Sequence, residues 1–354
     1  MGSIWGDCLR LSVFGESHGE GIGVVIDGFP PGVRVDYEFI SHELARRAPG
    51  SPGATTRRES DEPRFLSGIF NDITTGAPIC AVIGNTNVRS GDYADFARLP
   101  RPSHADYTSS LRYNGFSDYR GGGHFSGRLT APIVLAGALC RLYLSDMRAA
   151  AHLYSVGVIE DMPYRGHYGY FDMLSDAVFP TLDADAGRQM LQLAHDLRET
   201  GDSTGGVVEC VCDNIPAGLG NPTFGGVEQR IASLLFSIPG VKGVEFGAGF
   251  EISKMRGSES NDPFIFENNK VRTTSNHSGG IQGGITNGMP VVVRAAFKPT
   301  PSIAREQDTV DLESRCGSKI LIGGRHDPCI AFRAVPVVEA ACAIAFTDLI
   351  LGQQ

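Results

Sequence analysis

Two histidines lie in glycine- or proline-bounded loops, where an imidazole group can exchange protons with a ligand. His18 lies in the segment GESHG at 15–19, and His104 lies in RPSHADYT at 101–108. A single loop histidine is more often a surface residue than a catalytic one. A pair of them favours acid–base chemistry, because imidazole gains and loses a proton near neutral pH.

Segment 15–19 also matches G-x-S-x-G, the pattern around the nucleophile of many serine hydrolases. That pattern needs a strand before the serine and a helix after it. A strand is expected before Gly15, but residues 21–26 are glycine and β-branched residues, which form a poor helix. A nucleophile at Ser17 also leaves no room for a preceding sheet. We therefore reject the hydrolase and keep Ser17 and His18 as residues that bind or protonate a ligand.

A third loop segment combines three glycines with flanking arginines. The glycines at 121–123 lie between Arg120 and Arg128 and precede an apolar stretch. Backbone amides of such a loop, near the start of a helix, form a site for an anion. The alternative is a plain glycine hinge, which the two arginines make less attractive.

Two more segments bring charged residues into loops. KPTPS at 298–302 offers one cation and two hydroxyls, and GRHDPC at 324–329 places Asp327 before a proline. Either segment alone is a weak signal. Together, the polar segments of the chain nevertheless contain several cations: Arg47, Arg101, Arg128, Lys298 and Arg325. In a protein of net charge −9, this concentration predicts a small ligand with several negative charges.

The composition is that of a folded protein with an acidic surface. The 354 residues are 42% hydrophobic and 20% charged, which allows a sizeable core. The net charge argues against nucleic-acid binding. The eight cysteines show no paired zinc-ligand spacing, no secretory signal precedes the first strand, and the longest uninterrupted apolar stretches fall well short of a membrane span. No P-loop or Rossmann fingerprint occurs. We expect a cytoplasmic protein that binds neither nucleic acid nor membrane, with reduced thiols that mostly fill the core.

These loops require strands and helices to position them, and the hydrophobic pattern predicts both kinds of element. Strands are expected at 9–13, 24–26, 79–83, 207–211, 244–246 and 291–295. Helices are expected after a cap at Asp36 and at 133–147, 188–198 and 337–351. A long loop from 85 to 127 separates the early strands from the second helix. The fold class is therefore α+β.

One weak internal repeat is visible. Residues 24–27 form an apolar strand ending in Asp and lead to Pro-x-Gly at 30–32, and residues 210–213 lead in the same way to 216–218. This indicates a duplicated unit, although the same pattern describes many tight turns. Both halves carry polar glycine-rich loops. We expect one domain over residues 1–354, with a single site built from both halves.

Seven segments together resemble the chorismate synthase family. They are GESHG, RPSHADYT, DYRGGG at 118–123, SNHSGGIQGG at 275–284, KPTPS, GRHDPC and RAVPVVEA at 333–340. They occur in the family's order over essentially the whole chain. The resemblance implies a β-α-β sandwich, assembled as a homotetramer. It also implies a lyase that converts 5-enolpyruvylshikimate 3-phosphate to chorismate and phosphate by anti-1,4-elimination. The family requires reduced FMN, although its reaction has no net redox change.

The resemblance also implies roles for individual residues. His18 would act as an acid toward the reduced flavin, His104 would act near the leaving phosphate, and Asp327 would assist the flavin N5 in proton abstraction. The substrate-binding residues would be Ser17, Arg47, Arg101, Arg128 and Arg325. The flavin-binding residues would be His124, Phe125, Ser126, Pro239, Gly240, Gly284, Lys298, Pro299, Thr300, Pro301, Ser302 and Arg325. Arg47 would also contact NADPH, if NADPH is the source of electrons.

Two positions depart from the family's pattern. His124 stands where many members have arginine, which puts its role toward the flavin phosphate in doubt because imidazole is not always charged. Gly53 stands where many members have another arginine, and we hypothesise that Arg57 or Arg58 compensates. The chain shows no added reductase domain, which favours a separate flavin reductase. The alternatives are a flavin-dependent oxidoreductase acting on a phosphorylated small acid and a non-catalytic anion-binding protein.

Overall fold

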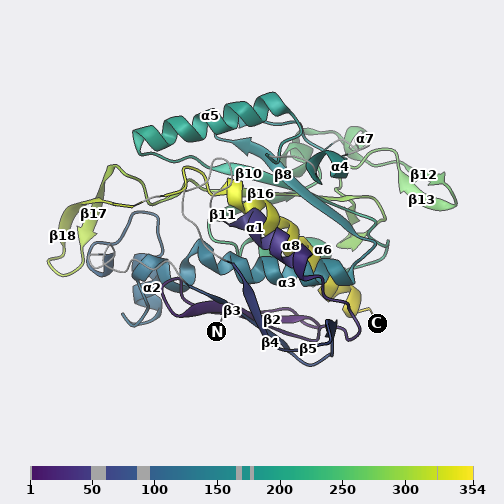
Figure 1. Cartoon of the computed structure of the whole chain (residues 1–354). Helices are drawn as coiled ribbons and strands as arrows, with labels where there is room; N and C mark the ends of the chain where they lie inside the picture. The colour runs from purple at the N-terminus through teal and green to yellow at the C-terminus, as the bar shows by residue number, and fades with distance from the viewer. Residues whose placement is uncertain are drawn as a thin grey trace.

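The computed structural model describes residues 2–48, 61–85, 96–164, 170–175, 179–324 and 326–353. Within these ranges, two five-stranded antiparallel sheets lie on either side of a layer of helices (Figure 1). Figure 1 shows the first sheet at the bottom, the helices in the middle and the second sheet above them. The predicted mixed α+β fold is confirmed.

The first sheet is built mostly from the N-terminal quarter of the chain. Its strand order is β1-β2-β3-β7-β4. The strands are β1 (Ile4–Trp5), β2 (Arg10–Gly15), β3 (Gly21–Asp27), β7 (Ile79–Gly84) and β4 (Pro63–Ser67). Alternate residues of β7 are buried, which places one face of this sheet against the helices.

The second sheet has the order β11-β16-β10-β8-β9. The strands are β11 (Val241–Phe246), β16 (Val291–Phe297), β10 (Gly206–Asp213), β8 (Arg148–Val156) and β9 (Ile159–Glu160). The hydrophobic pattern does not predict strand β8. This strand contains three consecutive alanines and is buried on both faces, so it lacks the polar alternation that marks a half-buried strand.

Four helices form the middle layer: α1 (Tyr37–Arg47), α3 (Thr130–Tyr143), α6 (Val227–Leu235) and α8 (Ala331–Leu351). Helix α3 contacts β3 and β7, whereas α8 contacts β8 and β10. The two helices cross closely at Gly137, where an added Cβ would clash with the Cβ of Ala340. Helix α8 is long and apolar enough to cross a membrane, but 89% of its apolar window is buried inside the protein. It is therefore a core helix.

The remaining elements lie around this sandwich. Helix α5 (Ala184–Thr200) runs along the top of Figure 1, while α2 (Asp106–Arg112) lies at the lower left. The others are α4 (Tyr170–Ser175), α7 (Gly257–Ser260), the 3-10 helices η2 (Arg120–Phe125), η3 (Gly127–Leu129) and η4 (Gly249–Lys254), and four hairpins. The hairpins are β5 (Ile69–Phe70) with β6 (Ile73–Thr74), β12 (Phe264–Glu267) with β13 (Lys270–Thr273), β14 (Ile281–Gln282) with β15 (Ile285–Thr286), and β17 (Glu306–Asp311) with β18 (Cys316–Leu321).

Most predicted elements are present, with shifted ends. The predicted cap is confirmed, because the Asp36 side chain accepts a hydrogen bond from the Phe39 amide at 2.9 Å. The helix predicted at 133–147 runs from Thr130 to Tyr143, so its predicted end is wrong. The predicted long loop at 85–127 contains α2 and η2 within its described part. All eight cysteines are free thiols, as expected.

Two turns in different halves of the chain make the same hydrogen bonds. Thr74 Oγ1 donates to the Pro30 carbonyl at 2.7 Å and accepts from the Val33 amide at 3.0 Å. Thr286 Oγ1 makes the equivalent bonds within segment 216–219, at 2.6 and 2.9 Å. Each threonine precedes a central strand of its own sheet, β7 in the first and β16 in the second.

Candidate active site

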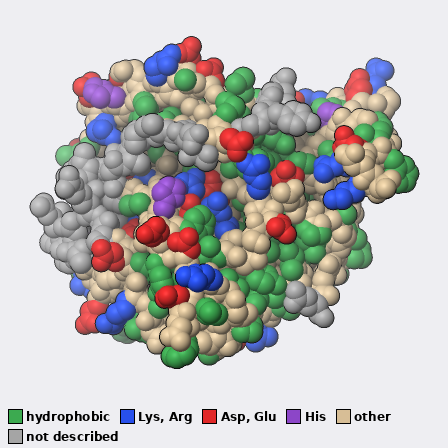
Figure 2. Space-filling model, turned by 45° about the vertical axis from the view of Figure 1, so that its right-hand side comes forward, with side chains coloured by type: hydrophobic (Ala, Val, Ile, Leu, Met, Phe, Trp, Pro, Cys, Tyr) green, Lys and Arg blue, Asp and Glu red, His purple; other side chains and the backbone are tan. Residues whose placement is uncertain are grey.

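A cavity of about 1040 Å³ opens where the N-terminal ends of α3 and α8 meet the loops that follow the strands. In Figure 2, basic, acidic and histidine side chains gather in a hollow on the visible face of the molecule. Two helix N-termini beside one cavity favour a negatively charged ligand, because the backbone dipoles present partial positive charge there. The described lining comes from β1, β2, α1, α3 and α8 and from the segments 2–3, 101–108, 121–129, 233–242, 297–302 and 326–330.

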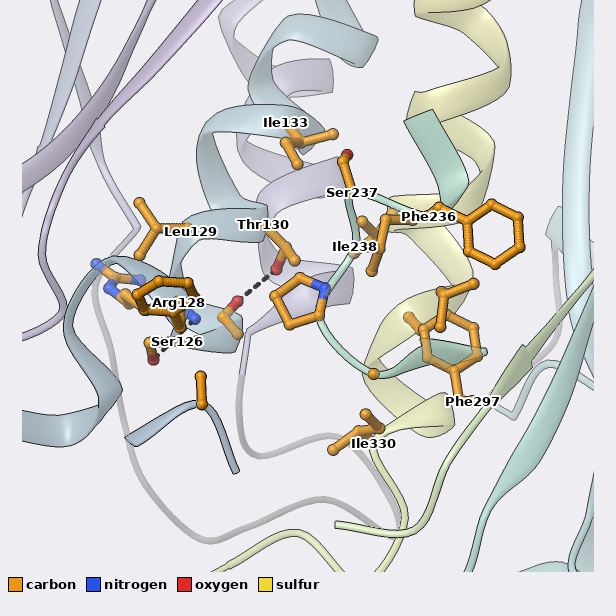
Figure 3. A pocket seen from close by; sticks show the side chains of 18 of the residues that line it. Ser126, Arg128, Leu129, Thr130, Ile133, Phe236, Ser237, Ile238, Phe297 and Ile330 are labelled. Atoms are coloured by element: carbon orange, nitrogen blue, oxygen red, sulfur yellow. Dashed lines mark hydrogen bonds between the residues drawn. The ribbon is translucent and has the colours of Figure 1, made fainter. Parts of the chain in front are cut away.

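One side of the cavity is apolar. Figure 3 shows its labelled side chains: Leu129 and Ile133 on one wall, and Phe236, Ile238, Phe297 and Ile330 on the other. Ser126 and Arg128 lie next to Leu129 in the same view. The cavity therefore offers an apolar compartment continuous with a charged one.

The three glycines at 121–123 pass directly beside the two predicted catalytic histidines. All three have positive φ, between 54° and 86°. A Cβ on Gly121 would lie 2.5 Å from the His18 ring, and a Cβ on Gly122 would lie 3.2 Å from Cε1 of His104. A side chain at 121 would displace the His18 imidazole and one at 122 would crowd that of His104, while a Cβ on Gly123 would clash with the Asp118 carbonyl oxygen. The sequence interpretation, an anion-binding loop, missed this packing role.

Ser17 and His18 lie behind this glycine segment. Ser17 Oγ donates to the Gly121 carbonyl at 3.1 Å, and the Ser17 amide donates to the Gly123 carbonyl at 3.1 Å. The His18 ring contacts Gly121, which itself lines the cavity. Neither Ser17 nor His18 is among the described residues that line the cavity. Gly121 lies between them and the cavity surface.

Arg101, His104 and Asp106 form a compact cluster at the cavity wall. Arg101 donates to the two carboxylate oxygens of Asp106 through Nε and Nη2, both at 2.8 Å. His104 Nδ1 lies 2.7 Å from Asp106 Oδ1. The tight turn at 101–104 makes this cluster, with Pro102 in second place and Ser103 at φ 58° in third, as a type II turn requires.

A second cluster joins Arg47 and Arg128 through one carboxylate. Arg47 at the end of α1 donates to Asp61 Oδ2 from Nη2 at 2.6 Å, and Arg128 pairs with the other oxygen of Asp61. The side chains of Arg47 and Arg128 are only 1% and 8% exposed. Burial alone raises the pKa of Asp61, but the two guanidinium groups outweigh it and lower that pKa. Two cations are thus held at the cavity around one permanent anion.

Asp327 and Lys298 also line the cavity, on two loops joined by a 2.7 Å hydrogen bond from Thr300 Oγ1 to the Asp327 carbonyl. Asp327 Oδ2 accepts from Arg333 Nη1 at 3.1 Å, and Arg333 Nε donates to the Arg47 carbonyl at 3.1 Å. Lys298 donates to the Ser103 carbonyl. Burial and the nearby charge of Lys242 lower the pKa of Lys298. Lys242 and Lys298 therefore place two cations on one part of the wall.

Most predicted flavin-binding residues line the same cavity. They are His124, Phe125, Ser126, Pro239, Gly240, Lys298, Thr300, Pro301 and Ser302. His124 is fixed by a 2.9 Å hydrogen bond between its Nδ1 and the Gly15 carbonyl. Pro299 is absent from the described lining. Gly284 lies in the turn between β14 and β15, where an added Cβ would meet the Asn221 carbonyl, and is not part of this lining.

Several predicted residues lie outside the described part of the chain. They are Arg325 and the loop positions Gly53, Arg57 and Arg58. Conversely, the structure adds residues that the sequence interpretation did not single out: Asp61, Ser103, Asp106, Lys242 and Arg333. Asp106 could have been predicted from the sequence, because a carboxylate two residues after a loop histidine is a usual hydrogen-bond partner for the imidazole ring. No motif or residue spacing in the sequence points to Asp61 or Arg333 as site residues.

Comparison with known proteins identifies the family. The family model described as chorismate synthase matches residues 9–351. A chorismate synthase from Dehalococcoides mccartyi is 47% identical over 355 residues, covering 99% of this chain and 97% of that protein. The chain belongs to the chorismate synthase family. A second chorismate synthase, from Thermococcus kodakarensis, is 45% identical over 351 residues, covering 99% of this chain and 98% of that protein.

The fold leads to the same family. A crystal structure of chorismate synthase superposes with a TM-score of 0.78 at 29% sequence identity, covering 99% of this chain and 93% of that one. The β-α-β sandwich expected for chorismate synthases is thus the fold of this chain. The family assignment rests on the whole chain and not on the loop motifs alone.

Proposed function

We propose that this chain is a chorismate synthase that eliminates phosphate from 5-enolpyruvylshikimate 3-phosphate. The observation that carries the proposal is the convergence of Arg47, Arg101 and Arg128 on one cavity that also holds His104 and Asp327. The substrate bears one phosphate and two carboxylates. Arginines whose side chains are already buried and fixed bind such anions with little further ordering, and they stabilise charge on the departing phosphate.

The cavity also fits flavin mononucleotide, whose apolar ring system carries a phosphate on a polar chain. The apolar compartment suits the rings, and Ser126, Lys298 and Thr300 suit the phosphate end. At about 1040 Å³ the space exceeds that of an ordinary single-ligand pocket. When bound in reduced form, the flavin supplies transient electron density and a basic N5, and it is not consumed.

In the elimination, a ring C–H bond breaks and its electron pair forms a double bond to the neighbouring ring carbon. The existing ring double bond moves one position along, and the C–O bond to phosphate breaks on the opposite face, its electron pair leaving with the phosphate oxygen. Asp327, oriented by Arg333, would assist removal of the ring proton at the flavin N5. His104 donates a proton toward the departing phosphate. His18, behind Gly121, would act as the acid toward the flavin.

Further parts of the proposal concern the cell and the assembly. We place the enzyme in the cytoplasm as a homotetramer, with reduced flavin supplied by a separate reductase and NADPH as the ultimate source of electrons. Gly284 lies apart from the cavity lining of its own chain, so its predicted contact with flavin is the weakest part of the proposed site.

The whole chain is proposed to be one domain built from a duplicated unit. The matching bonds of Thr74 and Thr286 support this proposal. So do the segments that contain them, ITTGAP at 73–78 and ITNGMP at 285–290, which lead into β7 and β16. Each of these strands pairs with the strand of the repeated pattern, β3 and β10 respectively.

The experiment is anaerobic conversion of 5-enolpyruvylshikimate 3-phosphate with chemically reduced FMN, following chorismate absorbance, free phosphate and flavin absorbance together. The proposal expects chorismate and phosphate in equal amounts, many per flavin, with no net flavin oxidation. Oxidation of one flavin per product would instead support the flavin-dependent oxidoreductase. No product from folded, flavin-bound protein would overturn the elimination.

A further inference from the structure

One carboxylate, Asp106, receives hydrogen bonds from two cationic side chains and from the backbone. Arg101 donates to it through Nε and Nη2, each at 2.8 Å, and through its amide at 3.0 Å. His104 Nδ1 lies 2.7 Å from Oδ1. The Asp106 side chain is only 4% exposed. A buried carboxylate with this many hydrogen bonds has a fixed position, and it can therefore fix the orientation of the His104 ring.

The His104 ring has two competing neighbours at the same nitrogen. Nδ1 lies 2.7 Å from Asp106 Oδ1 and 3.0 Å from Arg101 Nη2. A guanidinium group can only donate, whereas an ionised carboxylate can only accept. The two contacts therefore demand opposite tautomers of neutral His104: hydrogen on Nδ1 for Asp106, or hydrogen on Nε2 for Arg101.

The carboxylate is the stronger partner. Its distance is shorter, and a hydrogen bond to an ionised oxygen is about twice as strong as one between neutral groups. Burial alone raises the pKa of Asp106, but hydrogen bonds from Arg101 and His104 hold that pKa far below its usual range. Asp106 is thus ionised and accepts. One of the two Arg101 Nη2 hydrogens already has an acceptor in the same Oδ1, at 2.8 Å.

The other ring nitrogen, Nε2, is then left for the ligand. His104 lines the cavity, and glycine at 122 leaves space beside Nε2, since an added Cβ there would lie 3.4 Å away. We propose that Asp106 is a positioning residue that keeps the hydrogen of neutral His104 on Nδ1, so that Nε2 is the nitrogen that exchanges a proton with the ligand. This rests on the proposed function only for the identity of that ligand.

The tautomer is measured directly by solid-state nitrogen NMR on sedimented full-length enzyme labelled with 15N-histidine. The His104 signals are assigned by their loss in His104→Gln, at a pH above the imidazole titration. We expect a protonated Nδ1 and an unprotonated Nε2, and Asp106→Asn should lose that preference. A protonated Nε2 in the unchanged enzyme overturns the inference. This result does not depend on whether the enzyme makes chorismate.

A kinetic cycle separates positioning from simple support of the loop. Asp106→Asn should lower kcat by roughly two orders of magnitude. The same change in a His104→Ala background should lower kcat by less than about threefold, because the acid it positions is already gone. Equal losses in both backgrounds would show that Asp106 acts only by holding Arg101, and would overturn the inference.

The matched control is Asp311→Asn. Asp311 holds Arg98, three residues before Arg101, through a hydrogen bond at 2.6 Å from Nη2. Within the described part of the chain, its hydrogen bonds come from Arg98 and from the backbone amides of Glu313 and Ser314, and none comes from a histidine. We expect this variant to change kcat by no more than about twofold. A loss as large as that of Asp106→Asn would mean that any disturbance of this loop removes activity, and would contradict the proposed role.

Discussion

Two consecutive arginines at the end of α1 serve different parts of the molecule. Arg46 donates to Glu339 through Nη1 at 2.5 Å and Nη2 at 2.9 Å, between the helices of the middle layer. Arg47 points to the other side, where it binds Asp61 and lines the cavity. Their chemistry and local sequence are the same, so only the tertiary environment distinguishes them.

We call Glu43, Arg46, Arg141 and Glu339 the interhelix cluster. Glu339 is 2% exposed and also accepts from the Ala151 amide at 2.8 Å, so it ties α8 to β8 as well as to Arg46. Every charge in this cluster has a partner from the protein. The cluster can stabilise the sandwich, and none of its four residues belongs to the described lining of the cavity.

We call Arg47, Asp61, Arg101, Asp106 and Arg128 the cavity cluster. It uses the same arginine–carboxylate bonds, yet its arginines border a space large enough for substrate and cofactor. The comparison teaches that a buried arginine–carboxylate pair is not itself a sign of function. Access to a cavity with acid–base groups is what separates the two clusters.

The largest expected effect is at Asp327, the carboxylate proposed to assist proton removal. Asp327→Asn keeps the size of the side chain but removes the carboxylate, and should lower kcat by roughly two to four orders of magnitude. Phosphate release under reduced FMN measures this loss, and flavin fluorescence shows whether the cofactor still binds.

Asp172→Asn is the control for that variant, because it removes a carboxylate that pairs with Arg148 at 2.9 Å and lies outside both described cavity linings. It should keep nearly full activity. An Asp327→Asn enzyme with kcat within about threefold of the unchanged enzyme would remove Asp327 from the chemistry.

The interhelix cluster should respond through stability instead. Glu339→Gln removes the anion that pairs with Arg46 and Arg141, and should lower the free energy of unfolding by about 3 kcal/mol. The kcat of the folded variant should equal that of the unchanged enzyme. Urea unfolding followed by circular dichroism, beside the phosphate assay, measures both. A large fall in kcat with unchanged stability would erase the distinction between the clusters.

The stability of the Glu339→Gln variant should also depend differently on pH. Burial alone raises the pKa of Glu339, but Arg46 and Arg141 outweigh it and lower that pKa below its ordinary value of 4.5. A lowered carboxyl pKa contributes stability above pH 4.5 that is lost as the pH falls through the folded-state pKa. The stability of Glu339→Gln should therefore fall less steeply with acid than that of the unchanged protein. Parallel curves would contradict this assignment.

The sequence could predict the elements whose signals are local. The Asp36 cap, the alternating strand β7 and the apolar helix α8 were all predictable, although α8 begins earlier than expected. Strand β8 was not, because its alanines favour helix and both its faces are buried. Strand β8 is positioned by its pairing with β10, and the hydrophobic periodicity of a sequence does not reveal which strands pair.

In the site, too, contacts within one short segment were predictable from the sequence, and contacts between distant segments were not. Arg101 and His104 share one short segment, so their proximity was readable from the sequence. The contacts of Arg47 with Asp61, and of Asp327 with Arg333, depend on how the loops fold back. The sequence predicts an anion-binding loop at the glycines 121–123, and only the structure shows that they make room for two imidazoles.

The most direct test of the account compares one arginine from each cluster. Arg128→Gln and Arg141→Gln each remove a cation paired with a carboxylate. Calorimetric titration with 5-enolpyruvylshikimate 3-phosphate, in the presence of oxidised FMN so that no turnover occurs, gives the affinity of each variant. The account predicts a loss of at least about tenfold for Arg128→Gln and a change within about twofold for Arg141→Gln. Equal losses in both variants, or none in Arg128→Gln, would contradict it.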